Sequence, residues 1–168
     1  MADDRTDGTV VGEVARRVPP RHCDAQAMMH ASRPAEYFED AFLAWLDAAC
    51  GGYDRLREAG VDLVIAETTV RYRGSARLGD EIVARATPIE RGERSVRVRC
   101  DLVRAADVAG ADDGGGEAHE EVLVTATTAY ICVGVDGPTP LPPVLVDALA
   151  TTPRAERVVG GGGGRPPH

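Results

Sequence analysis

The stretch PAEYFEDAFLAWLDAACGG, residues 34–52, decides the fold. Its apolar residues recur at the spacing of one helix face, which predicts an amphipathic helix of about four turns. Pro34 suits the first turn of such a helix, and the Gly51-Gly52 pair suits its end. The two phenylalanines and the one tryptophan of the chain all lie on this face. The helix from residue 34 to residue 50 is therefore predicted to be the central packing element.

The segments on both sides of this helix have the patterns of β-strands. They are rich in β-branched residues or alternate between apolar and polar side chains, which is typical of half-buried strands. Strands are predicted at residues 10–18, 61–73, 81–89, 95–103 and 121–133. With a turn at residues 76–80 and a tight hairpin at 90–94, the last four strands are expected to form an antiparallel meander. The predicted class is α+β, with an antiparallel sheet of about five strands wrapped around one long central helix.

The length of 168 residues suits one domain with a single core. We expect this domain to span residues 10–150. Residues 1–9 and the glycine- and proline-rich residues 151–168 are predicted to be flexible tails, because polyglycine buries little and loses much backbone entropy on ordering. The glycine-rich residues 105–118 are predicted to form a mobile loop. A short C-terminal helix is expected before the second tail.

The charge of the chain limits its partners. The formal net charge is −8, and all 19 basic residues are arginines. An acidic protein does not attract nucleic acid in general, although a local arginine cluster can still bind a phosphorylated small molecule. The acidic N-terminus is unlike a signal peptide, and no apolar run approaches the ~20 residues that span a bilayer. We therefore expect a cytoplasmic protein that does not insert into membranes.

The four cysteines, Cys23, Cys50, Cys100 and Cys132, are far apart and form no Cys-x-x-Cys pair. This spacing indicates neither a zinc site nor a disulfide framework. We expect free thiols that pack as small apolar groups, and no bound metal.

Three stretches in the same order resemble a known family. They are RHCDAQAMMHASRPAEYFED (residues 21–40), AETTVRYRGSARLGDEI (66–82) and TATTAYICVGVDGPTPLPPVLVDAL (125–149). Together they are similar to the hotdog-fold acyl-CoA thioesterases, specifically the 4-hydroxybenzoyl-CoA thioesterase group, over residues 10–150. The chain departs from the family pattern where His22 replaces the first loop acid, Ala27 replaces a glycine and Pro34 replaces a tyrosine.

The resemblance implies candidate catalytic residues. Asp24 takes the place of the loop acid, which would attack the thioester carbonyl or draw a proton from water. Its apolar neighbours are expected to raise the pKa of its carboxyl group. Glu39 matches a helix glutamate used by another branch of the fold, His30 would orient water, and Thr68 lies on the strand expected near the site of a partner subunit. If Asp24 is not catalytic, it braces the loop, as most loop aspartates do.

The start of the helix and several flanking residues are expected to bind the substrate. Ser32 is the predicted N-cap, and the free backbone amides from Ser32 to Glu36, including that of Ala35, would stabilise a developing oxyanion. Met29 is expected to line an apolar pocket together with Met28 and Phe42. The exposed arginines of one short segment would bind the phosphates of coenzyme A: Arg71, Arg73 and Arg77.

The implied substrate is a thioester of coenzyme A or of an acyl carrier protein, with no further cofactor. In the resembled family, edge strands pair between subunits, so a homodimer or a dimer of dimers is expected. Two alternatives remain open. One is a hydratase or dehydratase of the same fold, which would pair Asp24 with His22 or His30. The other is a protein that binds acyl-CoA without turning it over.

Overall fold

The computed structural model describes residues 12–104 and 120–152. The predicted tails and the predicted glycine-rich loop at residues 105–118 lie outside these residues, apart from residues 151 and 152. Thr151 ends a helix and Thr152 is buried against the rest of the chain.

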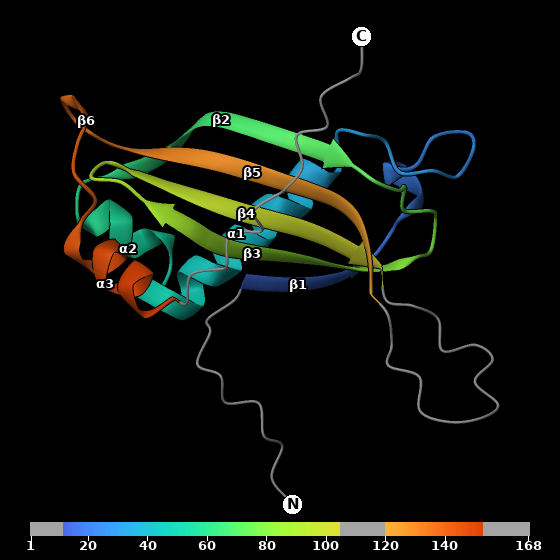
Figure 1. Cartoon of the computed structure of the whole chain (residues 1–168), viewed down its shortest axis with the longest axis horizontal. Coiled ribbons are helices and arrows are strands. Elements are labelled where there is room, and N and C mark those ends of the chain that lie inside the picture. Colours follow the sequence, from blue (N-terminus) through green and yellow to red (C-terminus); the bar gives the residue numbers. More distant parts are fainter. Residues whose placement is uncertain (1–11, 105–119, 153–168) are drawn as a thin grey trace, which may run out of the picture.

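One antiparallel sheet and one long helix make up most of the structure (Figure 1). The sheet has the strand order β1-β3-β4-β5-β2, and the short β6 pairs with β5. The strands are β1 (Gly12–Arg17), β2 (Asp62–Tyr72), β3 (Glu81–Arg91), β4 (Ser95–Arg104), β5 (Glu121–Gly134) and β6 (Gly137–Pro138). The helices are the 3-10 turn η1 (Pro20–His22), α1 (Pro34–Cys50), α2 (Tyr53–Glu58) and α3 (Pro143–Thr151). The predicted class, a sheet wrapped around one long helix, is confirmed.

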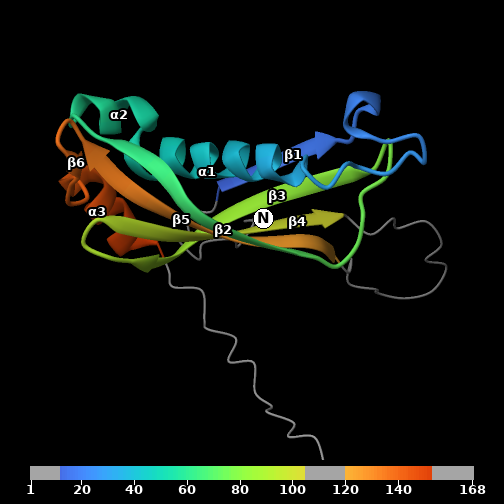
Figure 2. The ribbon, with the colours of Figure 1, turned by 90° about the horizontal axis from the view of Figure 1, so that it is seen from above.

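Helix α1 lies along one face of the curved sheet (Figure 2). Its apolar face is buried, and Trp45 and Leu46 are completely inaccessible to solvent. The helix approaches β1 very closely at Gly12. A Cβ atom at this position would lie 1.9 Å from the carbonyl oxygen of Ala41 and 2.7 Å from the Cβ of Trp45. Only glycine permits this contact, because any side chain would push the helix away from the strand.

The predicted four-strand meander is wrong in one respect. Strand β2 does not pair with β3, its neighbour in the chain. It pairs with β5 and so forms the edge of the sheet opposite β1. The connection at residues 73–80 is no hairpin turn, because its backbone groups pair with the segment before α1. The Leu78 N–H donates to the Ala27 carbonyl oxygen at 2.9 Å, and the Met29 N–H donates to the Ala76 carbonyl oxygen at 2.9 Å.

Strand β2 is the least covered element of the sheet. Helix α1 packs on β1, β3 and β4, and at β5 it reaches Tyr130 through Phe42. Most of β2 is consequently exposed, including large apolar side chains at Val64, Ile65 and Val70. This strand is also an edge, because it pairs with β5 on one side only; on the other side the Leu63 N–H donates to the Tyr53 hydroxyl at 3.0 Å.

A β-bulge changes the side-chain alternation within β2. The register with β5 shifts between Ile65 and Glu67, so Ile65 is opposite Tyr130 and Thr68 is opposite Thr128. Tyr130 and Thr128 are buried on the helix side of the sheet. Ile65 and Thr68 therefore face the same side as α1, although strict alternation would have placed them on opposite faces.

Candidate active site

The segment before α1 forms a short hairpin whose turn begins at Asp24. The Ala27 N–H donates to the Asp24 carbonyl oxygen at 3.0 Å, and the Asp24 N–H donates to the Met28 carbonyl oxygen at 2.8 Å. The Asp24 Oδ1 accepts the N–H groups of Gln26 at 2.8 Å and Met28 at 3.1 Å. Ala27 has a φ of 59°, which is the left-handed conformation that favours glycine. The turn is therefore ordered by the carboxyl group of Asp24 and strained at Ala27.

The carboxyl group of Asp24 is held in its charged form. The hydrogen bond from the Met28 amide is the largest cause that lowers its pKa, the Gln26 amide follows, and the charge of His30 acts in the same direction. The expectation that apolar neighbours raise this pKa is wrong, because the side chain is exposed and accepts backbone N–H groups. Asp24 is thus an ionised carboxylate at neutral pH, with its Oδ1 occupied by its own turn.

The start of α1 offers a backbone donor. Arg33 occupies the N-cap position with helical φ and ψ of −70° and −32°, and no side chain caps the helix. The prediction that Ser32 is the N-cap is wrong, because the next residue, Arg33, is the N-cap, and the Ser32 side chain is exposed and caps nothing. Pro34 has no N–H, and the Glu36 N–H donates to the Arg33 carbonyl oxygen at 3.1 Å. The Ala35 amide donates to no acceptor within residues 12–104 and 120–152.

The hairpin, the helix start and strand β2 are tied to one another. The His30 N–H donates to the His22 carbonyl oxygen at 2.9 Å, and the Arg33 N–H donates to the His30 carbonyl oxygen at 3.0 Å. The Tyr72 hydroxyl, near the end of β2, donates to the Ala31 carbonyl oxygen at 2.6 Å. These bonds hold the Asp24 turn and the first turn of α1 in a defined relation to the exposed edge strand.

A groove with a volume of about 440 Å³ lies between α1 and β2, and we call it the α1–β2 groove. Phe42 of α1 and Tyr130 of β5 form part of it, with their rings stacked at 4.5 Å between centroids. Of the predicted catalytic residues, Glu39 lines this groove. The other lining residues are Leu43, Tyr53, Asp54, Arg57, Asp62, Leu63 and Ile65. The groove therefore combines an aromatic wall and an exposed sheet edge with four charged side chains, those of Glu39, Asp54, Arg57 and Asp62.

Two further predicted residues lie elsewhere. The Thr68 hydroxyl is 3.2 Å from the hydroxyl of Thr128, with which it shares a hydrogen bond across β2 and β5. Met29 is buried in the core cluster, and its backbone bridges to Cys23 in the hairpin. The Met29 side chain thus anchors the hairpin to the hydrophobic core.

The three arginines predicted to bind coenzyme A are all exposed. Arg71 lies on β2, and Arg73 follows the end of this strand. Arg77 lies in the connection to β3, where its backbone bridges to Met28 and its N–H donates to Asp80 Oδ2 at 2.8 Å. Arg77 is therefore beside the Asp24 hairpin, whereas Arg71 belongs to the edge strand.

The pairs that a hydratase would need are not hydrogen-bonded in the described chain. His22 is buried, and its Nδ1 is 2.7 Å from the hydroxyl oxygen of Tyr37. Its Nε2 is 3.7 Å from Glu36 Oε2. The side chain of His30 is exposed, and the backbone of this residue makes its hydrogen bonds to His22 and Arg33. Neither histidine side chain bonds the carboxyl group of Asp24 in residues 12–104 and 120–152.

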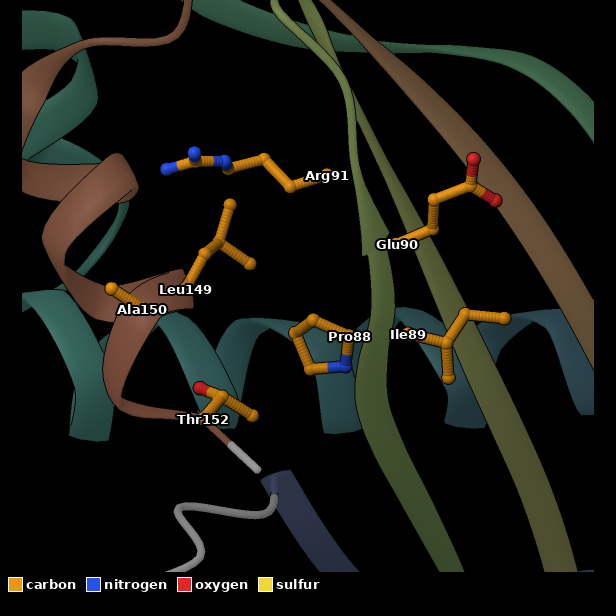
Figure 3. A pocket seen from close by; sticks show the side chains of 7 residues that line it. All are labelled: Pro88, Ile89, Glu90, Arg91, Leu149, Ala150 and Thr152. Carbon is orange, nitrogen blue, oxygen red and sulfur yellow. The ribbon is translucent and has the colours of Figure 1, made fainter. Parts of the chain in front are cut away.

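A separate hollow of about 420 Å³ lies between the end of β3 and α3 (Figure 3). It is lined by Pro88, Ile89, Glu90, Arg91, Leu149, Ala150 and Thr152. Arg91 extends towards α3 while Glu90 extends to the other side of β3 (Figure 3). Its charged groups do not converge, and it lies at the end of the molecule opposite the Asp24 hairpin (Figure 1). It is therefore a poor candidate for the active site.

No three His, Cys, Asp or Glu side chains of the described part of the chain gather where they could hold a metal ion. No helix of this part combines the length and apolar character needed to cross a membrane. All four cysteines are free thiols, as predicted, and three of them are buried.

Comparison with known proteins identifies the family. The model of the thioesterase-like superfamily matches residues 18–149, so the chain belongs to this superfamily. Membership indicates thioester hydrolysis as the class of reaction. No curated protein matches the chain.

Solved structures share the fold at low sequence identity. A 1,4-dihydroxy-2-naphthoyl-CoA thioesterase from Synechocystis is 16% identical, with a TM-score of 0.65 over 83% of this chain and 96% of that one. A gentisyl-coenzyme A thioesterase is 14% identical, with a TM-score of 0.66 over 82% and 98%. A hypothetical protein from Staphylococcus aureus in complex with CoA is 12% identical, with a TM-score of 0.69 over 93% and 96%. The fold is thus the hotdog fold.

Sequence reasoning missed several residues of the groove. Tyr130 and Tyr53 line it together with Ile65. The position of Ile65 depends on the bulge in β2, for which the sequence carries no clear signal. The alternation of β5 does place Tyr130 on the same face as Ala126 and Thr128, and this pattern indicates a buried aromatic residue on the helix side of the sheet.

The strain at Ala27 leads to a stability prediction. Replacing Ala27 with glycine is expected to raise the free energy of unfolding by about 1 kcal/mol, because glycine adopts positive φ without steric cost. Urea unfolding followed by Trp45 fluorescence measures the change. Ala25→Gly in the same turn is the matched control, and it should give no gain, since Ala25 does not have a positive φ. A less stable Ala27→Gly variant would show that the methyl group makes a needed contact.

The burial of His22 leads to a pH prediction. Desolvation is the largest cause that lowers the pKa of His22, and the charge of Arg33 acts in the same direction. The unfolded chain then binds a proton more readily, so stability is lost as the pH falls from about 7 to about 5.5. His22→Asn keeps a polar group for Tyr37 but does not titrate in this range. We expect urea unfolding of this variant to depend less on pH than that of the unmodified chain.

The control for this experiment is His30→Asn, which removes an exposed histidine from the same hairpin. This control should keep the pH dependence of the unmodified chain. If His22→Asn and the unmodified chain lose stability equally over this range, the buried ring is not the group that titrates.

Proposed function

We propose that this protein hydrolyses acyl thioesters of coenzyme A and that the α1–β2 groove holds the acyl group. The observation that carries the proposal is the groove itself, in which an aromatic wall and the Glu39 carboxylate lie beside an uncovered sheet edge. Membership of the thioesterase-like superfamily supports thioester hydrolysis as the reaction.

In this proposal Asp24, which is exposed and does not itself line the α1–β2 groove, is the catalytic carboxylate, acting as nucleophile or general base. Its ionised state supports either role, because both require a charged carboxylate at neutral pH. The amide of Ala35, which has no acceptor among the described residues, would donate to the carbonyl oxygen of the thioester as negative charge develops there. Such a donor typically contributes about 3 kcal/mol to the stability of the transition state. The positive end of the α1 dipole acts in the same direction.

The acyl group is proposed to be apolar or aromatic. Phe42 and Tyr130, whose rings stack on each other, give the groove an aromatic lining that suits an apolar or aromatic acyl group. Leu43 and Ile65 add apolar surface beside them. Coenzyme A is favoured over an acyl carrier protein, because a chain with a net charge of −8 repels an acidic carrier. The CoA-bound structural neighbour supports the same preference.

We also propose that two copies of the chain pair through β2. This strand is a long edge whose side chains are largely exposed, including Ile65 at 63% and Val70 at 37%. An exposed apolar edge of this length invites pairing with another strand. A second copy would cover the apolar face of β2 and close the α1–β2 groove. It would also shield the Asp24 turn from bulk water.

The catalytic assignment is tested by removing the charge of Asp24. Asp24→Asn retains an oxygen that can accept the Gln26 and Met28 amides, so the turn is preserved while the carboxylate is lost. We expect kcat for release of free thiol from aromatic acyl-CoAs to fall by about 10²-fold or more. Circular dichroism and urea unfolding should match those of the unmodified chain.

Glu39→Gln is the matched comparison, because Glu39 is a carboxylate that lines the groove. We expect this change to alter KM more than kcat. If Glu39→Gln abolishes turnover and Asp24→Asn does not, the catalytic role belongs to the helix and the assignment to Asp24 is wrong. A chain that releases no thiol from any acyl-CoA of a broad panel would contradict the proposed function as a whole.

The proposed dimer is tested by placing charge on the apolar face of β2. The double change Ile65→Arg with Val70→Arg is expected to convert a dimer to a monomer, as measured by light scattering after size-exclusion chromatography. Val135→Arg is the control, because Val135 is 99% exposed in the turn between β5 and β6. Retention of the dimer by the β2 variant would place the interface on another surface.

A further inference from the structure

A second cleft is separate from the α1–β2 groove. It lies between β1, the η1 turn and the first turns of α1, and its volume is about 380 Å³. Four arginines line it: Arg16, Arg17, Arg21 and Arg33. We call it the arginine cleft. Since β1 and β2 are the opposite edges of the sheet, pairing through β2 would not occupy the β1 strand that forms this cleft.

The charges in the arginine cleft are only partly compensated. Its two carboxylates each pair with one arginine, Glu36 with Arg33, and Asp40 with Arg16 at 3.7 Å. Arg17 uses its Nε to donate to the Gly79 carbonyl oxygen at 3.1 Å and has no carboxylate partner within residues 12–104 and 120–152. The same part of the chain supplies no ion-pair partner for Arg21. An excess of positive charge therefore remains in the cleft of an acidic protein.

The cleft is built on buried polar side chains. His22 and Tyr37, which line it, are only 8% and 4% exposed, and their side chains are hydrogen-bonded at 2.7 Å. The Nε of Arg33 is buried and has no hydrogen-bond partner in the described residues. Buried polar groups are normally paired, so an unpaired guanidinium nitrogen indicates a donor that an occupant or water would satisfy. The arginines of the cleft thus lie beside the hydrogen-bonded pair of His22 and Tyr37.

We infer that the arginine cleft binds a phosphate or diphosphate group of a small molecule. Guanidinium groups present paired N–H donors whose spacing matches the oxygens of phosphate. The concave shape favours a compact anion, while the Glu36 and Asp40 carboxylates would repel a long polyanion such as nucleic acid. Arg17 and Arg21 are the main ligands, because the carboxylates of the cleft occupy the other two arginines.

The cleft and the proposed catalytic turn share one segment of the chain. His22 lines the cleft, and its carbonyl oxygen accepts the His30 N–H that closes the Asp24 hairpin. The phosphate group could belong to coenzyme A or to a separate phosphorylated molecule. The inference itself does not rest on the proposed thioesterase activity, because it concerns binding at residues outside the α1–β2 groove.

Calorimetric titration of the full chain with pyrophosphate tests the inference. We expect the unmodified chain to bind pyrophosphate, and Arg21→Gln to weaken the binding by about tenfold, as loss of a charged hydrogen bond predicts. Arg17→Gln combined with Arg21→Gln should weaken it further. Arg55→Gln is the matched control, because Arg55 is an exposed helix arginine that does not line the cleft and pairs with Glu58 at 3.0 Å.

Thermal unfolding of each variant separates lost binding from lost structure. Arg21→Gln is the single change least expected to destabilise the fold, because the Arg21 side chain makes no ion pair in the described chain. Failure of the unmodified chain to bind pyrophosphate at millimolar concentration would overturn the inference. Equal affinities of the unmodified chain, Arg21→Gln and the Arg55→Gln control would also overturn it, since binding would then occur elsewhere.

The same titrations with coenzyme A and with pantetheine identify the source of the phosphate. If the arginine variants weaken the binding of coenzyme A as they weaken that of pyrophosphate, and leave pantetheine unaffected, the cleft holds the phosphates of the thioester substrate. If they weaken only pyrophosphate, the cleft serves a separate phosphorylated ligand. Both outcomes support a phosphate site, and neither requires that the protein turn over a thioester.

Discussion

The close contact between α1 and β1 is the constraint on which the rest of the structure depends. Gly12 lets the helix backbone at Ala41 and the base of Trp45 approach the strand more closely than any side chain would allow. The helix is consequently held over β1, β3 and β4, where its apolar face is fully covered. The sheet is wider than one helix, so β2 remains open and the α1–β2 groove appears along the uncovered boundary.

The fold was predictable because its strongest signals are local. The helix from Pro34 to Cys50 has the bounds that its apolar spacing predicts, and the five longer strands lie close to the predicted ranges. The strand order was not predictable in the same way. A turn at residues 76–80 suggested that β2 and β3 are neighbours, but the backbone groups of this segment pair with the hairpin before α1. Such long-range pairing leaves no periodic pattern in the sequence.

The candidate site was predictable in part for the same reason. The resemblance to the thioesterase family pointed to Asp24 and Glu39, and Glu39 does line the groove. The electrostatic state of Asp24 depends on which atoms face its carboxyl group, and apolar neighbours in sequence do not determine this. Its Oδ1 accepts two amides of its own turn, which lower the pKa rather than raise it. The arginine cleft could not be predicted for another reason. Its arginines come from β1, the η1 turn and the residue before α1, and only the folded chain brings these segments together.

The β-bulge at Ala66 has a consequence for how this edge strand tolerates change. Beyond the bulge, Tyr72 reaches the Ala31 carbonyl oxygen on the helix side, and Arg71 is directed to the opposite face. Deleting the extra residue would exchange the two faces from position 67 onward. Arg71 would then turn to the helix side of the sheet, and Tyr72 would turn away from Ala31. Single-residue indels here should consequently be much rarer among related proteins than ordinary substitutions of the exposed side chains.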